Sequence, residues 1–145
     1  MSDFANYNQI LSDVVAATKA SGIDFRKVTS DADDHDFQYQ NMPMCDWRIR
    51  RNAPELVQGQ TYYSAIQLEA EIACFDMTSR TKCATMRNDL TAALQGFFQA
   101  NPRFSGYVDS TVVGPVEFEI GETKAQGEFI AAAVATFTVF FYSEQ

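Results

Sequence analysis

The sequence has little of the side-chain chemistry that active sites usually need. Its 145 residues include a single histidine, His35, and three cysteines that form no CxxC pair. Its seven glycines form neither of the phosphate-binding patterns GxGxxG and GxxxxGK[ST]. We therefore predict a protein that is not an enzyme, with no catalytic residues, no cofactor and no metal.

Long apolar segments are missing as well. No stretch reaches the ~20 consecutive apolar residues that a membrane-spanning helix needs, and the N-terminus has no apolar run of signal-peptide length. The odd number of cysteines leaves one unpaired in any scheme, so we expect three reduced thiols in a protein made in the cytoplasm. Cys74 and Cys83 are interpreted as small core residues.

Basic residues are few relative to acidic ones. Lys and Arg total 11 against 19 Asp and Glu, which gives a net charge of −8. A general positive field for nucleic acid is thereby excluded. Aromatic residues are plentiful, with 12 Phe and 6 Tyr, and supply more apolar material than one core requires.

The acidic residues form three groups that could hold a ligand. The run from Asp31 to Asp36 offers carboxylates for a hard cation, but it lacks the glycine and the closing glutamate of an EF-hand loop. We interpret it as a solvated loop. The pairs Glu69/Glu71 and Glu117/Glu119 could act as acid and base, but their regular alternation with apolar residues favours a solvated face or the lining of an assembly.

The basic residues Arg48, Arg50 and Arg51 form one compact group in this acidic chain. They could bind phosphate or meet a carboxylate-rich face of a neighbouring subunit. Because the protein itself is so acidic, we favour the subunit interface.

Hydrophobic periodicity predicts a single α+β domain over residues 1–145. Helical spacing covers residues 3–21, with Ser2 or Asp3 as N-cap and Gly22 after the last turn, and residues 79–100, with Ser79 or Thr81 as N-cap. The expected fold has two helices packed on one face of a mostly antiparallel sheet. Strands are expected at 23–29, 45–51, 60–76, 107–113, 116–120 and 128–142, with a loop at 52–59.

The last of these strands is apolar on both faces, from Phe129 to Tyr142. Two helices can cover only one face of a sheet. We therefore expect another copy of the chain to cover the second face.

The order of elements resembles that of the tail terminator proteins of long-tailed bacteriophages, also called tail-completion or head–tail joining proteins. The likeness lies in an N-terminal helix, a long strand at 61–75, the helix at 79–100, the segment 112–119, a glycine-bounded turn at 121–127 and the terminal strand ending AVATFTVFFY.

This resemblance implies a structural virion protein of the tail and neck. Six copies would form a ring on the last ring of the tail-tube protein, end tube growth and meet the head–tail connector or stopper protein. Genomic DNA would pass through the lumen without sequence-specific binding, which an acidic lining favours because carboxylates repel phosphates. Two alternatives stay open: a neck, stopper or tail-tube protein of the same virion, and a small acidic α+β enzyme or ligand-binding domain.

Overall fold

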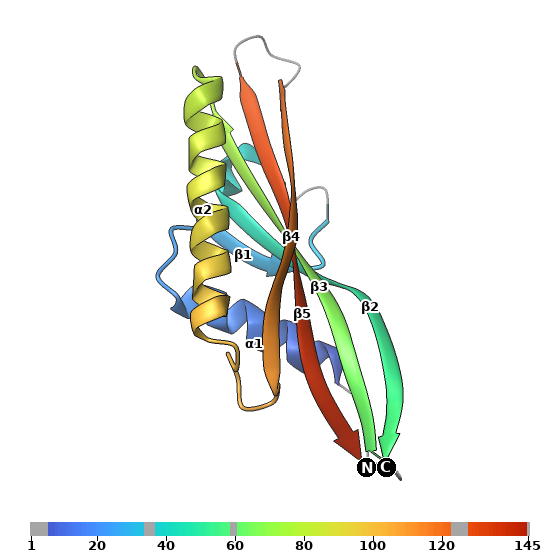
Figure 1. The fold of residues 1–145 in the computed structure, drawn as a ribbon. Helices are drawn as coiled ribbons and strands as arrows, with labels where there is room; N and C mark the ends of the chain where they lie inside the picture. The colour runs from blue at the N-terminus through green and yellow to red at the C-terminus, as the bar shows by residue number, and fades with distance from the viewer. Residues whose placement is uncertain (1–5, 34–36, 59–60, 123–127, 145) are drawn as a thin grey trace.

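The computed structural model describes residues 6–33, 37–58, 61–122 and 128–144 (Figure 1). It has two helices and a five-stranded sheet with the strand order β1-β2-β3-β5-β4. Strand β1 runs parallel to β2, and the other neighbours are antiparallel, which confirms the α+β prediction. The elements are α1 (Tyr7–Ala20), β1 (Lys27–Ser30), the short 3₁₀ helix η2 (Tyr39–Asn41), β2 (Met44–Gln58), β3 (Thr61–Asp76), α2 (Arg80–Ala100), β4 (Ser110–Glu122) and β5 (Phe129–Glu144).

Both helices have side-chain caps at their first turn. Helix α1 begins later than predicted, because the side chain of Asn6 accepts a hydrogen bond from the Gln9 backbone N–H at 3.1 Å. The predicted caps Ser2 and Asp3 lie outside the described residues. Gly22 follows α1 with φ +80°, the left-handed conformation predicted for it. Helix α2 begins after Ser79, which accepts from the Lys82 N–H, as predicted.

Strand β2 is longer than the sequence indicates. The predicted loop at 52–59 is wrong over 52–58, since β2 stays paired with β3 up to Gln58; Gly59 lies outside the described residues. Pro54 is compatible with this because β1 pairs only with Met44–Trp47, so the remainder of β2 is an edge, where proline occurs. A register shift between Ile49 and Arg51 places Arg51 opposite Gln67. Strict alternation along the strand predicted at 45–51 would put Arg51 on the same face as Trp47 and Ile49, and this expectation is therefore wrong.

Strand β4 joins two segments that the sequence separates. The predicted break at Gly114 and Pro115 is a register irregularity between Val113 and Val116 within one continuous edge strand. Gly114 is needed there, because a Cβ at this position would lie 2.9 Å from the backbone oxygen of Thr136 on β5.

Trp47 of β2 lies at the centre of the core and is fully buried. Its indole N–H donates to Thr18 Oγ1 of α1 at 3.0 Å, and its ring contacts Phe98 of α2 and Phe137 of β5, with centroids 5.4 and 5.3 Å away. From its side of the sheet, Trp47 thus contacts one residue of each helix. The core continues through Ile66, Leu68, Ile72, Leu94 and Val139.

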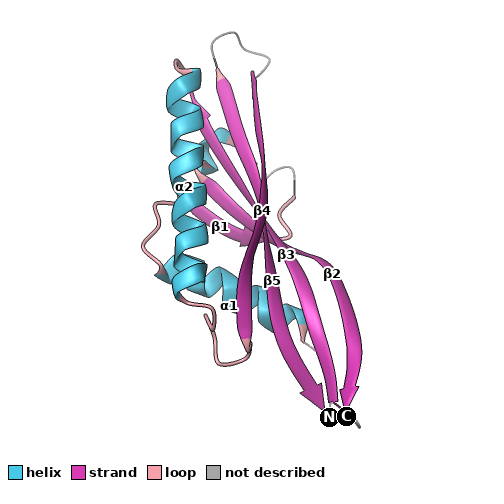
Figure 2. Cartoon of the chain, viewed as in Figure 1, coloured by secondary structure: helices cyan, strands magenta, loops and turns pink. Residues whose placement is uncertain are grey.

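The opposite side of the sheet is covered less completely. At one end, Met42, Met44 and Ala73 form a small second cluster with Phe37 and Phe75, and the ring of Tyr39 in η2 stacks on Phe75. Along β5, the residues that alternate with the buried core positions are only half-buried, namely Ile130, Ala132, Val134, Thr136, Thr138 and Phe140. The β2–β3 pair and the C-terminal end of β5 extend together beyond both helices (Figure 2).

Candidate functional site

Arg48 on β2 binds both carboxylates of the Glu69/Glu71 pair on β3. Its Nε lies 3.0 Å from Glu69 Oε1 and its Nη1 lies 2.9 Å from Glu71 Oε1. The sheet register brings these groups together by placing Arg48 opposite Glu69. Partial burial lowers the pKa of Arg48, but the hydrogen bonds and charges of Glu71 and Glu69 outweigh it, so the net pKa is raised. Arg48 and this carboxylate pair thus stabilise each other within one chain.

Arg50 and Arg51 are more accessible than Arg48. Arg50 is 64% exposed, and its Nη1 lies 3.5 Å from Glu69 Oε2, a loose contact. Arg51 is exposed and has no ion pair or hydrogen bond to any described residue. The predicted group of three arginines therefore divides: Arg48 is held by its own chain, and the other two are available to a ligand or partner.

Arg50 and Arg51 border a cavity of about 450 Å³ between α1 and the edge of β2. Asn52 lies in its wall, where its Nδ2 donates to the Tyr7 hydroxyl at 2.7 Å while its Oδ1 is buried without a hydrogen-bond partner. We call this feature the arginine edge. Its lining consists of Tyr7, Asn8, Leu11, Asp31, Ile49, Arg50, Arg51 and Asn52.

The second carboxylate pair, Glu117 and Glu119, lies on β4 at the opposite edge of the sheet. Both residues are exposed, and neither side chain has a hydrogen bond or ion pair to a described residue. Two apolar side chains on the same strand are exposed by about half, Val112 (51%) and Phe118 (53%). We call these four residues of β4 the acidic edge.

Arg87 of α2 fixes this part of β4 from the helix side. Its guanidinium lies 5.0 Å from the centroid of the Phe118 ring, and its Nη1 donates to the Glu119 backbone oxygen at 2.7 Å. Arg87 is itself buried. Arg87 therefore holds the backbone of the acidic edge in place, while the carboxylates of Glu117 and Glu119 have no partner in the described part of the chain.

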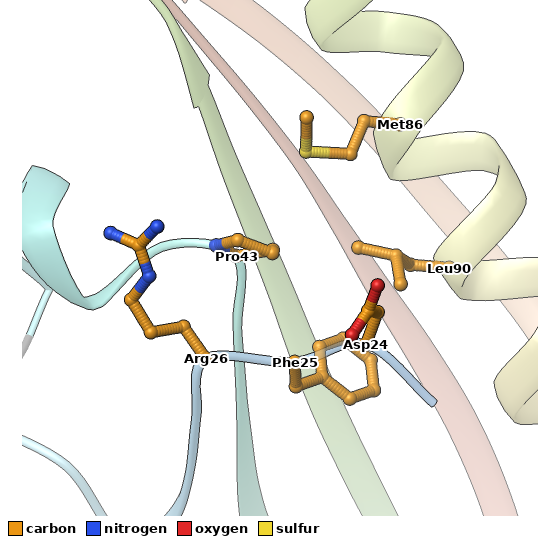
Figure 3. Close-up of a pocket in the computed structure, with 6 residues that line it drawn as sticks. All are labelled: Asp24, Phe25, Arg26, Pro43, Met86 and Leu90. Carbon is orange, nitrogen blue, oxygen red and sulfur yellow. The ribbon is translucent and has the colours of Figure 1, made fainter. Parts of the chain in front are cut away.

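Two further cavities lie beside α2, and no sequence motif predicted them. The first, of about 420 Å³, lies between Pro43, the segment Asp24–Arg26 and the helix (Figure 3). Met86 and Leu90 point into it, whereas the Arg26 side chain extends away from α2 and donates to the Gln40 backbone oxygen at 3.0 Å. The second, of about 470 Å³, shares Met86 and Leu90 and is bordered by Asp76, Thr81, Lys82, Thr85 and Asp89.

The remaining residues that the sequence analysis considered as ligands or nucleophiles are those of the acidic loop and the three cysteines. Within the described residues, no three His, Cys, Asp or Glu side chains are placed to hold a metal. Asp34, His35 and Asp36 of the acidic loop lie outside the described residues, while Asp31 and Asp33 are exposed. Cys45, Cys74 and Cys83 are free thiols with fully buried side chains, which agrees with their interpretation as core residues.

Burial makes these thiols poor nucleophiles. It raises the pKa of Cys74 to about 12, with a smaller contribution from the neighbouring Cys83. The pKa values of Cys45 and Cys83 are raised for the same main reason. Because the thiolate is the reactive form, the structure gives these cysteines packing roles.

A scan against protein-family models and a search of curated proteins found no match to this chain. Neither helix in the described part of the chain is long and apolar enough to cross a bilayer. The two charged edges and the sheet between them are the features of this chain that bear on its function.

Proposed function

We propose that this chain is a structural, non-enzymatic virion protein that forms a ring at the head-proximal end of a phage tail tube. In this role it ends tube growth and joins the tail to the head through a connector or stopper protein, and DNA passes through the acidic lumen. The proposal extends the resemblance in element order, and six is the ring size that the resemblance implies.

The observation that carries the proposal is the unequal cover of the two sheet faces. Thr18 of α1 and Phe98 of α2 both contact Trp47, which supports the packing of both helices on one face. The other face of β5 is left half-buried over Ile130, Val134 and Phe140. Apolar surface of this kind is typical of a protein that is completed by association.

Two measurements test the proposal. Light scattering and negative-stain electron microscopy of the purified protein should show closed rings, either alone or once tail tubes are added. Deletion of the gene in a phage that encodes it should give tubes of abnormal length that fail to join heads.

Two results would contradict the proposal. One is a protein that stays monomeric with and without tubes, together with tails of normal length after deletion. The other is labelling of the protein along the entire tail, which would identify a tail-tube protein; a label at the neck, away from the last tube ring, would identify a stopper.

A further inference from the structure

Among the described residues, two exposed groups of opposite charge, Arg50 with Arg51 and Glu117 with Glu119, lie at opposite edges of one sheet. The strand order β1-β2-β3-β5-β4 separates β2 from β4 by two strands. Beyond Trp47, β2 has no β-strand partner on its outer side in the described part of the chain, and β4 pairs only with β5. Both strands are therefore open to a neighbouring molecule.

The charges on these edges are opposite and unequally satisfied within the chain. On β2, Arg51 has no partner among the described residues and Arg50 only the 3.5 Å contact with Glu69. On β4, Glu117 and Glu119 are exposed without a described partner. Arg48 serves as an internal comparison, because its two contacts of 3.0 and 2.9 Å bind it to carboxylates of its own chain.

The register places the two charged groups on the same face of the sheet. Arg51 lies opposite Gln67, which alternates with the buried Ile66 and Leu68. Glu117 lies opposite Val134, which alternates with the buried Ala133 and Ala135. Successive strand residues point to opposite faces, so both groups belong to the face that does not carry Trp47.

We propose that the acidic edge of one copy binds the arginine edge of the next copy, with Glu117 and Glu119 contacting Arg50 and Arg51. This inference rests on the proposed function, since it names the contact by which the ring would form. Because the two edges are different surfaces, the contact is head-to-tail, and its repetition closes a ring when the rotation between copies allows it. The exposed Val112, which the register places on the same face as these charges, adds apolar contact area.

The contact is made by side chains more than by a continuous β-ladder. Pro54 interrupts the edge of β2, and Pro115 interrupts the edge of β4 beside its register irregularity. Proline on edge strands prevents indiscriminate pairing with other chains. Charge matching then supplies the specificity that backbone pairing alone would not give.

Charge reversal on each edge, followed by reversal on both, tests the inference. The variant with Arg50→Glu and Arg51→Glu and the variant with Glu117→Arg and Glu119→Arg should each lose self-association. A dissociation constant raised by about 100-fold or more is expected, because like charges then face each other. The variant with all four substitutions should associate again, and an equimolar mixture of the two single-edge variants should form alternating assemblies.

The control variant carries Lys19→Glu and Arg103→Glu, two exposed residues away from both edges, and changes the net charge as much as the first variant does. It should associate like the wild type. Circular dichroism and thermal unfolding establish that each variant folds, and rescue by the fourfold variant cannot arise from misfolding. Association is measured by analytical ultracentrifugation, in the presence of tail tubes if rings need them.

The outcomes separate the two proposals. If wild-type rings form but charge reversal leaves them unchanged, or if neither the fourfold variant nor the mixture restores them, the edge contact is wrong while the ring function stands. If the wild type forms no ring even with tubes, the proposed function fails, and the edge contact fails with it.

Discussion

At the residue scale, one indole nitrogen joins the sheet to a helix. The Trp47 N–H donates to Thr18 Oγ1, which in turn donates to the Val14 backbone oxygen at 2.7 Å, so every polar atom of this chain of bonds has a partner inside the core. A buried N–H without an acceptor would cost its full desolvation free energy. The single tryptophan therefore depends on the single hydroxyl beside it.

Replacement Thr18→Val should remove this acceptor while keeping the shape of the side chain. The buried indole N–H is then left unpaired, and we expect the free energy of unfolding to fall by about 1–3 kcal/mol. Urea unfolding followed by tryptophan fluorescence measures the change. Thr85→Val, on an exposed position of α2, is the matched control and should change stability little. Equal stability of the two variants would contradict this role of Thr18.

At the element scale, Asp76 fixes the passage from β3 into α2. Its Oδ1 accepts from the backbone N–H groups of Thr78 at 2.9 Å and Ser79 at 2.7 Å. Both hydrogen bonds lower the pKa of Asp76, and the one from Thr78 has the larger effect. Because Ser79 also caps α2, the carboxylate orients the residue that begins the helix.

The stabilisation by ionised Asp76 should therefore depend on pH in one direction. The pKa of Asp76 is lower in the folded state than in the unfolded state. The stability that its carboxylate contributes is therefore fully present above the unfolded-state pKa and is lost as the pH falls through the folded-state pKa. The difference in unfolding temperature between wild type and Asp76→Ala should be largest at neutral pH and should narrow below pH ~4. Asp76→Asn, which keeps an acceptor without the charge, should lack this pH-dependent part. If the difference in unfolding temperature between wild type and Asp76→Ala stays constant from pH 7 to pH 2, the ionised carboxylate does not stabilise the fold.

The register irregularity in β4 leads to a second prediction at this scale, which concerns the pairing of β4 with β5 at Gly114. A methyl group at position 114 would meet the Thr136 backbone oxygen at 2.9 Å, so Gly114→Ala should force β4 away from β5. We expect a loss of about 1–3 kcal/mol, as for other overpacked sites. Gly96→Ala in α2 is the matched control, since a Cβ there would have no atom within 4 Å beyond the adjacent residues and the helix's own backbone, and alanine favours helix. Destabilisation by Gly96→Ala and not by Gly114→Ala would reverse the expected order.

At the scale of the whole molecule, the question is whether a second copy covers the half-buried face of the sheet. A substitution on that face can test this. Val134 lies on this face, between Glu71 of β3 and Glu117 of β4 in the register. A lysine at this position has carboxylates on both sides, which single chains tolerate well. A neighbouring copy covering the face would instead have to bury the added charge.

Val134→Lys should accordingly change thermal stability of the isolated chain little and weaken ring formation strongly. Val134→Thr, which adds polarity without charge, should have a smaller effect on association. Thermal unfolding and analytical ultracentrifugation measure the two properties separately. If Val134→Lys rings form as readily as wild-type rings, this face is not covered by another copy.

Local sequence patterns predicted much of the fold and some of the site. Helix α2 and its Ser79 cap, strand β3 and the buried Cys74 and Cys83 all follow from short-range periodicity and polarity. The extension of β2 through Pro54 did not, because its pairing partner comes from a different part of the chain. Neither did the joining of 110–113 with 116–122 into one strand, since only the neighbouring β5 keeps the two segments aligned.

The sequence by itself determined the charge balance, the alternation along most strands, two carboxylate pairs and the group of three arginines at positions 48, 50 and 51. Only the tertiary structure decided which of these charges neutralise one another. Register across β2 and β3 brings Arg48 to Glu69 and Glu71, while the strand order carries Glu117 and Glu119 to the far edge, away from Arg50 and Arg51. The physical reason is that ion pairing depends on distance in space, and a sheet sets that distance by the order and register of its strands.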